Sequence, residues 1–469
     1  MTHGTRLTAL DHSFLELEGR TTHMHVGGCA IFDGPAPAYQ ELVDAVAGRL
    51  DMVPRYRQRL LPVPFGQGRP VWVDDPQFRL PFHLRHTALP APGSEAQLRR
   101  LAGRIFSQAL DRGRPLWELW LVEGLTGDRF ALISKTHHAL IDGVSGVDIA
   151  SVIFDTAPNP ESSAPPARPW APRPLPSAAQ LLADALIERG TKPAEAVQTL
   201  SALATGPRAL VGRLGASIGG LGSVGWMGFD PAPRSPFNVP IGPHRRFSWV
   251  DASLADFQRV KRARQTTIND VILTVVAGAL GAHMRSHGLD TDGLVLRALV
   301  PVSVRDGSQR GALGNRLAAM RAPLPVGVID PLVRLSTVAE AMASVKRSGQ
   351  AVGAQALTEL AGFASPTLVA QAARLQTRQR LFNLVVTNVP GPQQPLYLLG
   401  RQMLAIYPLV PLAANTALGI AVLSYNGRLD FGLNGDFDQL PDLEELADEL
   451  SRSIREIVQV ASTAAAVAS

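Results

Sequence analysis

The stretch that decides the fold of this chain is Lys135-Thr136-His137-His138-Ala139-Leu140-Ile141-Asp142-Gly143. Just before it, residues 129–134 are mostly apolar and follow a Thr-Gly-Asp turn, a pattern that predicts a buried strand. After it, apolar residues recur at helical spacing from Val144 to Ile153, and Asp142 suits the N-cap of that helix. We therefore expect both histidines on a tight turn between a strand and a helix.

Such a turn favours an uncharged histidine. Backbone amides and the positive end of the following helix gather there, and both disfavour an imidazolium ion. A neutral histidine at a strand end is what a general base requires. The alternative is that both histidines are ordinary loop residues, but titrating groups on rigid turns are more often functional.

The bulk composition indicates a globular protein. A chain of 469 residues is too long for one ordinary core, so two domains are expected. The net charge of +5 is spread along the chain without a block of like charges, which argues against a nucleic-acid partner and favours an anionic small molecule or lipid headgroup. The single cysteine, Cys29, allows no internal disulfide, indicates a reducing, cytoplasmic compartment, and fits a core position better than a nucleophile.

Membrane contact, if any, is expected at a surface. The N-terminus lacks the basic-then-apolar pattern of an export signal, and the longest apolar runs are too short or too interrupted to span a bilayer. Residues Ser177–Ser217 interleave leucines with arginines at helical spacing. That segment can lie on lipid, at the inner membrane face or a lipid inclusion, or it can pack on the protein, and the sequence leaves both open.

Composition divides the chain into three parts. Residues 1–156 mix helices and strands, residues 157–234 begin with a Pro/Ala/Ser-rich stretch that is typical of a linker, and residues 235–469 return to a globular pattern. Near the end, Asn426-Gly427 between two apolar runs is a strong hairpin signal. An amphipathic helix over Leu443–Val458 is expected to close the chain.

The residue types around the turn narrow the chemistry. A catalytic metal is disfavoured because three protein ligands are usual and no third histidine or cysteine lies near His137 and His138. An acyl-enzyme is disfavoured because no credible nucleophile is paired with a base. A lone histidine base remains, acting on a hydroxyl or amine that attacks a bound electrophile directly.

His137 to Gly143 spell HHxxxDG, and this motif resembles the signature of the CoA-dependent acyltransferase superfamily, which includes chloramphenicol acetyltransferase-like enzymes and peptide-synthetase condensation domains. The wider pattern resembles the bacterial bifunctional wax ester synthase/diacylglycerol acyltransferase family. The landmarks run in the family's order and are Leu10-Asp11, Phe14–Glu18, Met24–Gly28, Pro115-Leu116-Trp117, Ser235–Asn238, His244-Arg245-Arg246, Asn269-Asp270, Leu313-Gly314-Asn315 and Asn388–Pro392.

The resemblance implies an α+β fold of two chloramphenicol acetyltransferase-like domains with mixed sheets, joined by a long linker, with the histidine turn midway along a tunnel between them. Acyl-CoA is the implied co-substrate, and no cofactor or metal is expected. The implied acceptor is diacylglycerol first and a long-chain fatty alcohol second. The implied product is therefore a neutral lipid.

The resemblance also implies roles at the turn. His138 takes the proton of the acceptor hydroxyl and returns it to the leaving thiolate, and His137 supports it. Asp142 orients the loop through an ion pair, and Gly143 lets backbone approach the site. Asn269, at a helix start, is the candidate for positioning the acceptor or the oxyanion.

The substrate-binding candidates are weaker. Pro115, Leu116 and Trp117 either shape the acyl pocket or form an ordinary core strand. Asp270 is counted with the substrate side, although its position also fits a helix cap. Arg245 and Arg246 are candidates for the CoA phosphates.

Two rival functions stay open. An amide-forming condensation domain needs carrier-protein partners, and no carrier segment adjoins this chain. A catalytically idle lipid-surface protein resting on Ser177–Ser217 has no need of an intact His138 or Asn269.

Overall fold

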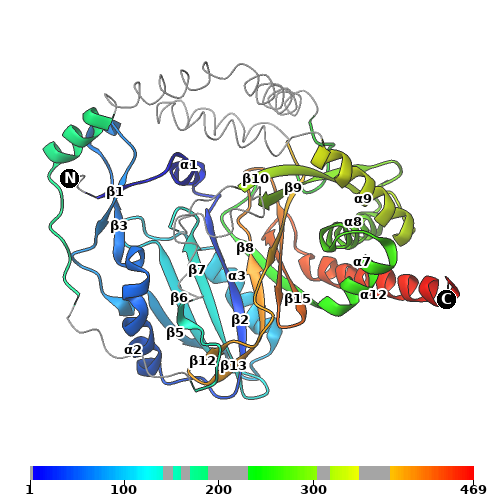
Figure 1. Ribbon diagram of the computed structural model, residues 1–469, viewed down its shortest axis with the longest axis horizontal. Helices are drawn as coiled ribbons and strands as arrows, with labels where there is room; N and C mark the ends of the chain where they lie inside the picture. The colour runs from blue at the N-terminus through cyan, green and yellow to red at the C-terminus, as the bar shows by residue number, and fades with distance from the viewer. Residues whose placement is uncertain are drawn as a thin grey trace, which may run out of the picture.

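Two six-stranded sheets stand side by side and divide the molecule into two lobes (Figure 1). The computed structural model describes residues 4–140, 152–159, 170–188, 231–303, 317–347 and 381–468. Most of the helix expected after Asp142, most of the expected linker and residues 189–217 of the segment Ser177–Ser217 therefore lie outside the described residues.

The N-terminal lobe is built on a sheet with the strand order β12-β13-β2-β7-β6-β5. Only β5 and β6 pair in parallel. Helix α2 packs on one face and α3 on the other, each adding its leucines to a hydrophobic cluster. The bounds are β2 His25–Asp33, α2 Tyr39–Arg49, β5 Leu84–Ala88, α3 Glu95–Phe106, β6 Trp117–Leu125, β7 Arg129–His137, β12 Tyr397–Leu398 and β13 Arg401–Leu409.

Smaller elements surround this sheet. A three-stranded sheet of order β1-β4-β3 lies at the edge of the lobe, with helix 178–188 packed on it through Leu181 and Ala185. The bounds are β1 Thr5–Arg6, α1 Ala9–Leu17, β3 Gln58–Leu61, β4 Val71–Asp74, and the short 3-10 helices Leu50–Met52, Pro54–Arg57, Pro64–Gly66 and Leu80–Phe82.

The C-terminal lobe carries a sheet of order β10-β9-β11-β14-β15-β8, with α7, α8, α9 and α12 forming one hydrophobic core with it. The hairpin at Asn426-Gly427 is confirmed, because β14 and β15 pair across it and both turn residues have positive φ. The bounds are β8 Arg245–Ser253, α7 Leu254–Arg264, α8 Ile268–Ser286, β9 Val295–Ser303, β10 Leu317–Pro325, α9 Pro331–Arg347, β11 Leu384–Pro390, β14 Leu418–Tyr425, β15 Arg428–Asp436 and α12 Leu443–Ala468.

The two lobes exchange chain. After β11, residues 391–396 leave the C-terminal sheet, and β13 pairs with β2 in the N-terminal sheet before β14 returns. A cut of the chain near residue 235 therefore does not separate the sheets. Backbone approaches closely at this crossing, because a Cβ on Gly432 of β15 would lie 1.8 Å from the carbonyl oxygen of Pro408 on β13.

One hydrophobic cluster joins the lobes. It combines Ile105 and Phe106 of α3, Ile133 of β7 and Trp249 of β8 with the inner face of β13. Cys29 lies fully buried in the same cluster, and burial raises the pKa of its thiol, so its core position is confirmed.

Within the described residues, no single helix has both the length and the apolar composition needed to cross a membrane. Helices α7 and α8 meet the criteria only as a pair, and they are bent by 103° relative to each other.

Candidate active site

Strand β7 ends on the histidine pair. His137 is its last residue and pairs with His25 of β2, and the turn follows at once. The main-chain amide of His138 donates to the carbonyl of Met24, at 2.8 Å, and the amide of Leu140 donates to the carbonyl of His137, at 2.9 Å. The turn is therefore anchored by backbone bonds, and residues 138–140 lie where the sequence placed them.

His137 is fully buried and its ring is used for structure. The amide of Ala139 donates to its Nδ1 at 3.0 Å, so Nδ1 is an acceptor and the ring proton belongs on Nε2. That Nε2 faces Oε2 of Glu18 at 3.7 Å. The first imidazole thus holds the turn in shape.

Glu18 connects the His137 ring to Arg112 at the surface. Its Oε2 also accepts from Nε of Arg112 at 2.9 Å, and its Oε1 accepts from the amide of Met24 at 3.3 Å. Burial alone would raise the pKa of Glu18, but the adjacent His137 and Arg112 outweigh it and lower the pKa to about 2. A permanent negative charge therefore lies behind the first histidine.

His138 has a different environment. Its ring stacks on Phe14 of α1, with centroids 3.9 Å apart and planes 25° apart, and its Nδ1 is buried without a hydrogen-bond partner in another described residue. Burial lowers the pKa of His138 to about 4, more than a bond to its own backbone raises it, and His137 lowers it further. The ring is neutral at pH 7, and Nε2 is the atom left to meet a substrate.

Lys135 and Glu118 stabilise the contact between β7 and α3, behind the turn. Lys135 of β7 is completely buried, and its Nζ donates to the carbonyls of Ile105 and Gln108 at the C-terminal end of α3. The same Nζ lies 3.3 Å from Oε2 of Glu118. Helix α3 is thereby fixed to the strand that carries the histidines.

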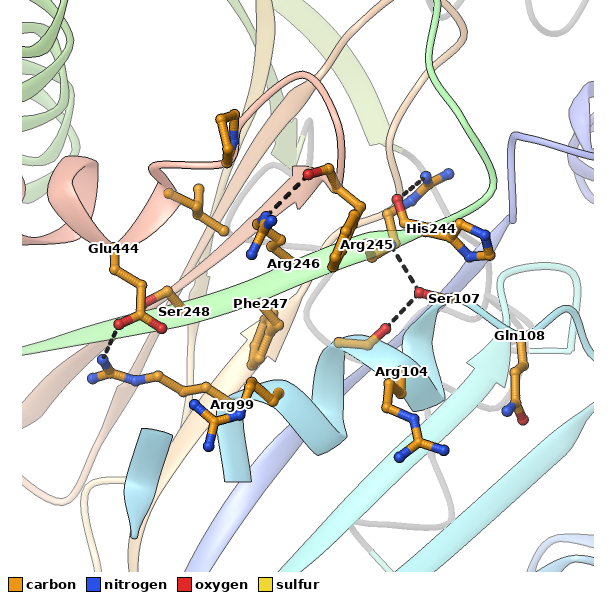
Figure 2. Close-up of a pocket in the computed structure, with 15 residues that line it drawn as sticks. Arg99, Arg104, Ser107, Gln108, His244, Arg245, Arg246, Phe247, Ser248 and Glu444 are labelled. Carbon is orange, nitrogen blue, oxygen red and sulfur yellow. Dashed lines mark hydrogen bonds and ion pairs between the residues drawn. The ribbon is translucent and has the colours of Figure 1, made fainter. Parts of the chain in front are cut away.

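A cavity of about 730 Å³ opens between α3 and β8, beside the contact between α3 and β7 (Figure 2). Arginines dominate its lining, and Phe247, Phe437 and Leu443 add apolar surface. The arginines are Arg99, Arg100, Arg104, Arg245 and Arg246.

The arginines of the cavity are not equivalent. Arg99 lies over the ring of Trp249 and near Glu444, and Arg246 lies over the ring of Phe437. Arg100 and Arg104, one helical turn apart on α3, are exposed, and no carboxylate among the described residues pairs with them. They leave two uncompensated positive charges at the cavity.

The cavity wall is continuous with the histidine turn. Ser107 accepts a hydrogen bond from the amide of Arg245, and the Arg245 guanidinium donates to the carbonyl of Thr21. Three residues on from Thr21, Met24 binds the amide of His138. The segment from Thr21 to Met24 therefore contacts both the cavity wall and the turn that carries the candidate base.

Comparisons with known proteins agree over the whole chain. The wax ester synthase/diacylglycerol acyltransferase catalytic domain matches residues 7–272, and the C-terminal domain of the same enzymes matches residues 313–458. The chain belongs to this family.

Individual relatives support the assignment. The chain is 34% identical to the probable diacylglycerol O-acyltransferase tgs1 of Mycobacterium tuberculosis, covering 97% of this chain and 96% of that protein. It is 33% identical to the probable diacylglycerol O-acyltransferase tgs2 of the same species, covering 96% and 98%. The resemblance inferred from the sequence motifs is confirmed.

Solved structures confirm the fold. The wax ester synthase/diacylglycerol acyltransferase from Marinobacter aquaeolei superposes with a TM-score of 0.66 at 29% identity, covering 98% of this chain and 100% of that one. The starter condensation domain of rhizomide synthetase superposes with a TM-score of 0.58 at 16% identity, covering 98% and 95%, which bears on the fold alone. The expected α+β fold of two chloramphenicol acetyltransferase-like domains is correct.

The structure separates the family site residues that the sequence had grouped. His137 and His138 lie together at the end of β7, whereas Asp142 and Gly143 lie outside the described residues. Asn269 is half-buried in the first turn of α8, and no hydrogen bond joins it to His138 in the described part of the chain. Its role stays a prediction.

Asp270 caps a helix. Its Oδ2 accepts from the amide of Thr267, at 2.9 Å, and the Thr267 hydroxyl accepts from the amide of Asp270, at 3.2 Å. This reciprocal pair is a capping box and occupies one carboxylate oxygen of the residue. The capping alternative therefore describes Asp270 better than a substrate contact.

Arg245 requires a correction. Only 4% of its surface is exposed, and its guanidinium donates to the carbonyls of Gly242, His244 and Thr21 beside Asp436. Its guanidinium already makes three hydrogen bonds inside the protein, so a side chain buried to this extent is not presented to a CoA phosphate. Of the two adjacent arginines, only Arg246 has a surface position at the cavity.

Pro115, Leu116 and Trp117 are buried in the core of the N-terminal lobe. Trp117 donates from Nε1 to the carbonyl of Tyr56 at 2.8 Å and stacks on His83. The core-strand alternative thus accounts for these residues.

Sequence analysis missed the partners of the two histidines. Phe14 and Glu18 stood among the opening landmarks, but nothing in their spacing pointed to His138 and His137, more than a hundred positions later. Arg100 and Arg104 did carry a signal, since two arginines four apart on an amphipathic helix without acidic neighbours indicate an anion site.

Proposed function

We propose that this chain esterifies diacylglycerol with the acyl group of an acyl-CoA, and that His138 is the general base. Family membership supports the substrate classes. One observation carries the mechanism: His138 is neutral, stacked on Phe14, and has its Nδ1 edge buried, so that Nε2 alone is presented to a substrate.

In the proposed reaction, Nε2 of His138 takes the proton of the acceptor hydroxyl as its oxygen attacks the thioester carbonyl. The tetrahedral intermediate collapses, the carbon–sulfur bond breaks, and the imidazolium returns its proton to the leaving thiolate. His137 keeps the turn in shape through its bond from Ala139, and its Nε2 lies 3.7 Å from Oε2 of Glu18. No covalent acyl-enzyme is needed.

Acyl-CoA is proposed to approach from the arginine cavity. CoA carries a 3′-phosphate and a diphosphate, and guanidinium groups are well suited to bind phosphate. Arg100 and Arg104 supply unpaired charge there, with Arg246 beside them. Asn269 is proposed to act on the acceptor side.

The acceptor is a lipid, so the enzyme is proposed to work on the cytoplasmic side at a membrane or lipid inclusion. Helix 178–188 supports both alternatives left open by the sequence. Leu181 and Ala185 pack on the protein, whereas Leu186 and Ile187 are 61% and 64% exposed. We propose that these two outward apolar side chains contact lipid while the opposite face of the helix packs on the protein.

The test is an acyl-transfer assay with purified protein and palmitoyl-CoA, adding diacylglycerol or hexadecanol in separate reactions. Release of free CoA and formation of lipid ester are followed together. We expect triacylglycerol at a rate above that of wax ester. CoA release that is independent of any acceptor would indicate hydrolysis and would contradict the proposal.

A further inference from the structure

Two histidines and an aspartate meet at the far end of α8. His283 lies in the last turn of α8, His287 is the C-cap that follows Ser286, and Asp442 immediately precedes α12. Nε2 of His283 lies 3.2 Å and Nε2 of His287 lies 2.8 Å from the same oxygen, Oδ2 of Asp442. The three ligand atoms all lie within 4.8 Å of one another.

The protein already orients one of these rings. Nδ1 of His287 lies 2.8 Å from the carbonyl oxygen of His283. Because that oxygen can only accept, Nδ1 carries the proton, and the Nε2 of a neutral His287 presents a lone pair to Asp442. A lone pair and a carboxylate oxygen repel each other unless a proton is shared between them or a metal ion binds both. Metal-binding histidines are held in this way, with a carbonyl on the distal nitrogen.

The surroundings suit a positive ion. Glu445 and Glu449 of α12 add negative charge close to His283, although Glu449 also pairs with Arg452. The side chain of His283 is 7% exposed and that of His287 is 45% exposed, so the site has a buried wall and an open side. An ion can enter and keep a water ligand.

We propose that His283, His287 and Asp442 bind a divalent transition-metal ion, Zn²⁺ foremost, through three protein ligands and one water. Two imidazoles and a carboxylate are a common zinc donor set, and imidazole also suits Ni²⁺ and Cu²⁺. Zinc bonds of about 2.0–2.2 Å separate tetrahedral ligands by roughly 3.3 Å. The His283 contact already fits, and the half-exposed His287 needs only to move outward slightly.

The site lies at the opposite end of α8 from Asn269 and borders the arginine cavity, because Asp442 stands between Pro441 and Leu443, which line that cavity. His283 lies 14 residues beyond Asn269 on α8, which corresponds to about 21 Å along the helix. The ion would join the end of α8 to the start of α12, the two central helices of the C-terminal lobe. Its effect is therefore expected on stability, and its test does not depend on acyl transfer.

The experiment uses the full chain after treatment with a chelator and gel filtration. Zn²⁺ binding is measured by calorimetry, Co²⁺ binding by the visible absorption of tetrahedral cobalt, and thermal unfolding with and without Zn²⁺. We expect one ion per chain, a tetrahedral cobalt spectrum, and a melting temperature that rises by several degrees with Zn²⁺.

His287→Gln and Asp442→Asn should each abolish the cobalt spectrum and the zinc-dependent rise, and asparagine keeps the helix cap. The matched control is His86→Gln, since His86 and Glu123 form a half-exposed histidine–carboxylate pair with Nε2 and Oε1 2.7 Å apart, and no third metal ligand joins them among the described residues. It should leave both readouts intact. Equal zinc binding by the wild type and His287→Gln would place the ion at other residues, and no binding by either would leave a proton-shared ion cluster; each result would overturn the proposal.

Discussion

The amide of Ala139 donates a hydrogen bond to Nδ1 of His137 at 3.0 Å, and this bond gives the two adjacent histidines different roles. The His137 ring holds the turn in shape, and its Nε2 faces Glu18. The second ring stacks on Phe14 and keeps its Nε2 free. Adjacent identical residues thus acquire a structural role and a chemical one from their neighbours alone.

The first prediction concerns pH. Because the base must be unprotonated and burial lowers the pKa of His138 to about 4, kcat/KM should stay nearly constant as pH falls through 6.5, the ordinary value for histidine. It should fall only as pH approaches 4. The measurement is kcat/KM against pH, with circular dichroism at each pH to show that the fold persists. A half-maximal loss near pH 6.5 would rule out the buried neutral ring.

Glu18→Gln tests the support of the first histidine. The amide keeps an acceptor for the amide of Met24 but loses the charge that faces His137 and Arg112. We expect kcat to fall about tenfold, equivalent to about 1.4 kcal/mol in the barrier, with KM for both substrates little changed. The control is Glu16→Gln, which changes a residue of α1 two positions before Glu18. An unchanged kcat for Glu18→Gln would remove Glu18 from the catalytic arrangement.

The arginine cavity is tested by the double variant Arg100→Ser/Arg104→Ser. If these side chains bind CoA phosphates, KM for palmitoyl-CoA should rise about tenfold at low salt, with kcat preserved and a smaller effect at high ionic strength. KM for a palmitoyl thioester of N-acetylcysteamine, which lacks the phosphates, should not change.

The charge-matched control for that variant is Arg262→Ser/Arg264→Ser on α7, which does not line the cavity. A rise in KM that is equal for both thioesters, or equal in the control, would place the CoA phosphates elsewhere.

Gly432→Ala tests the contact between the sheets. The added methyl group would lie 1.8 Å from the carbonyl oxygen of Pro408, so β13 and β15 must separate. We expect a loss of about 1–3 kcal/mol in the free energy of unfolding, measured by denaturant titration. Gly48→Ala is the control, because a Cβ there meets nothing within 4 Å and α2 gains helix propensity. Equal stability of the two variants would mean that the lobes are loosely joined.

Local pattern was enough to predict the repeating elements. The apolar run over residues 129–134, the helical spacing over Leu443–Val458 and the Asn426-Gly427 turn each express a preference of a few consecutive residues, and they correspond to β7, α12 and the hairpin between β14 and β15. The 3-10 helices around residues 50–57 were missed because they lack a hydrophobic period. The exchange of β13 into the other sheet was also missed, since strand pairing at a distance leaves no local mark.

The same difference between local preference and contacts of distant segments applies to the candidate site. His137 and His138 were identified because they are consecutive and follow a strand. Phe14, Glu18 and Arg112 come from other segments, and only packing brings them to the histidines. Arg245 was misjudged because sequence gives an arginine's charge but not its burial.

The most direct test of the central claim is single-turnover acyl transfer from palmitoyl-CoA to diacylglycerol by His138→Ala, compared with the wild type. Loss of the general base should slow transfer about 10²- to 10⁴-fold, while the melting temperature stays within a few degrees because the ring forms no hydrogen bond with another described residue. A folded His138→Ala protein that transfers acyl groups within about tenfold of the wild-type rate would contradict the account.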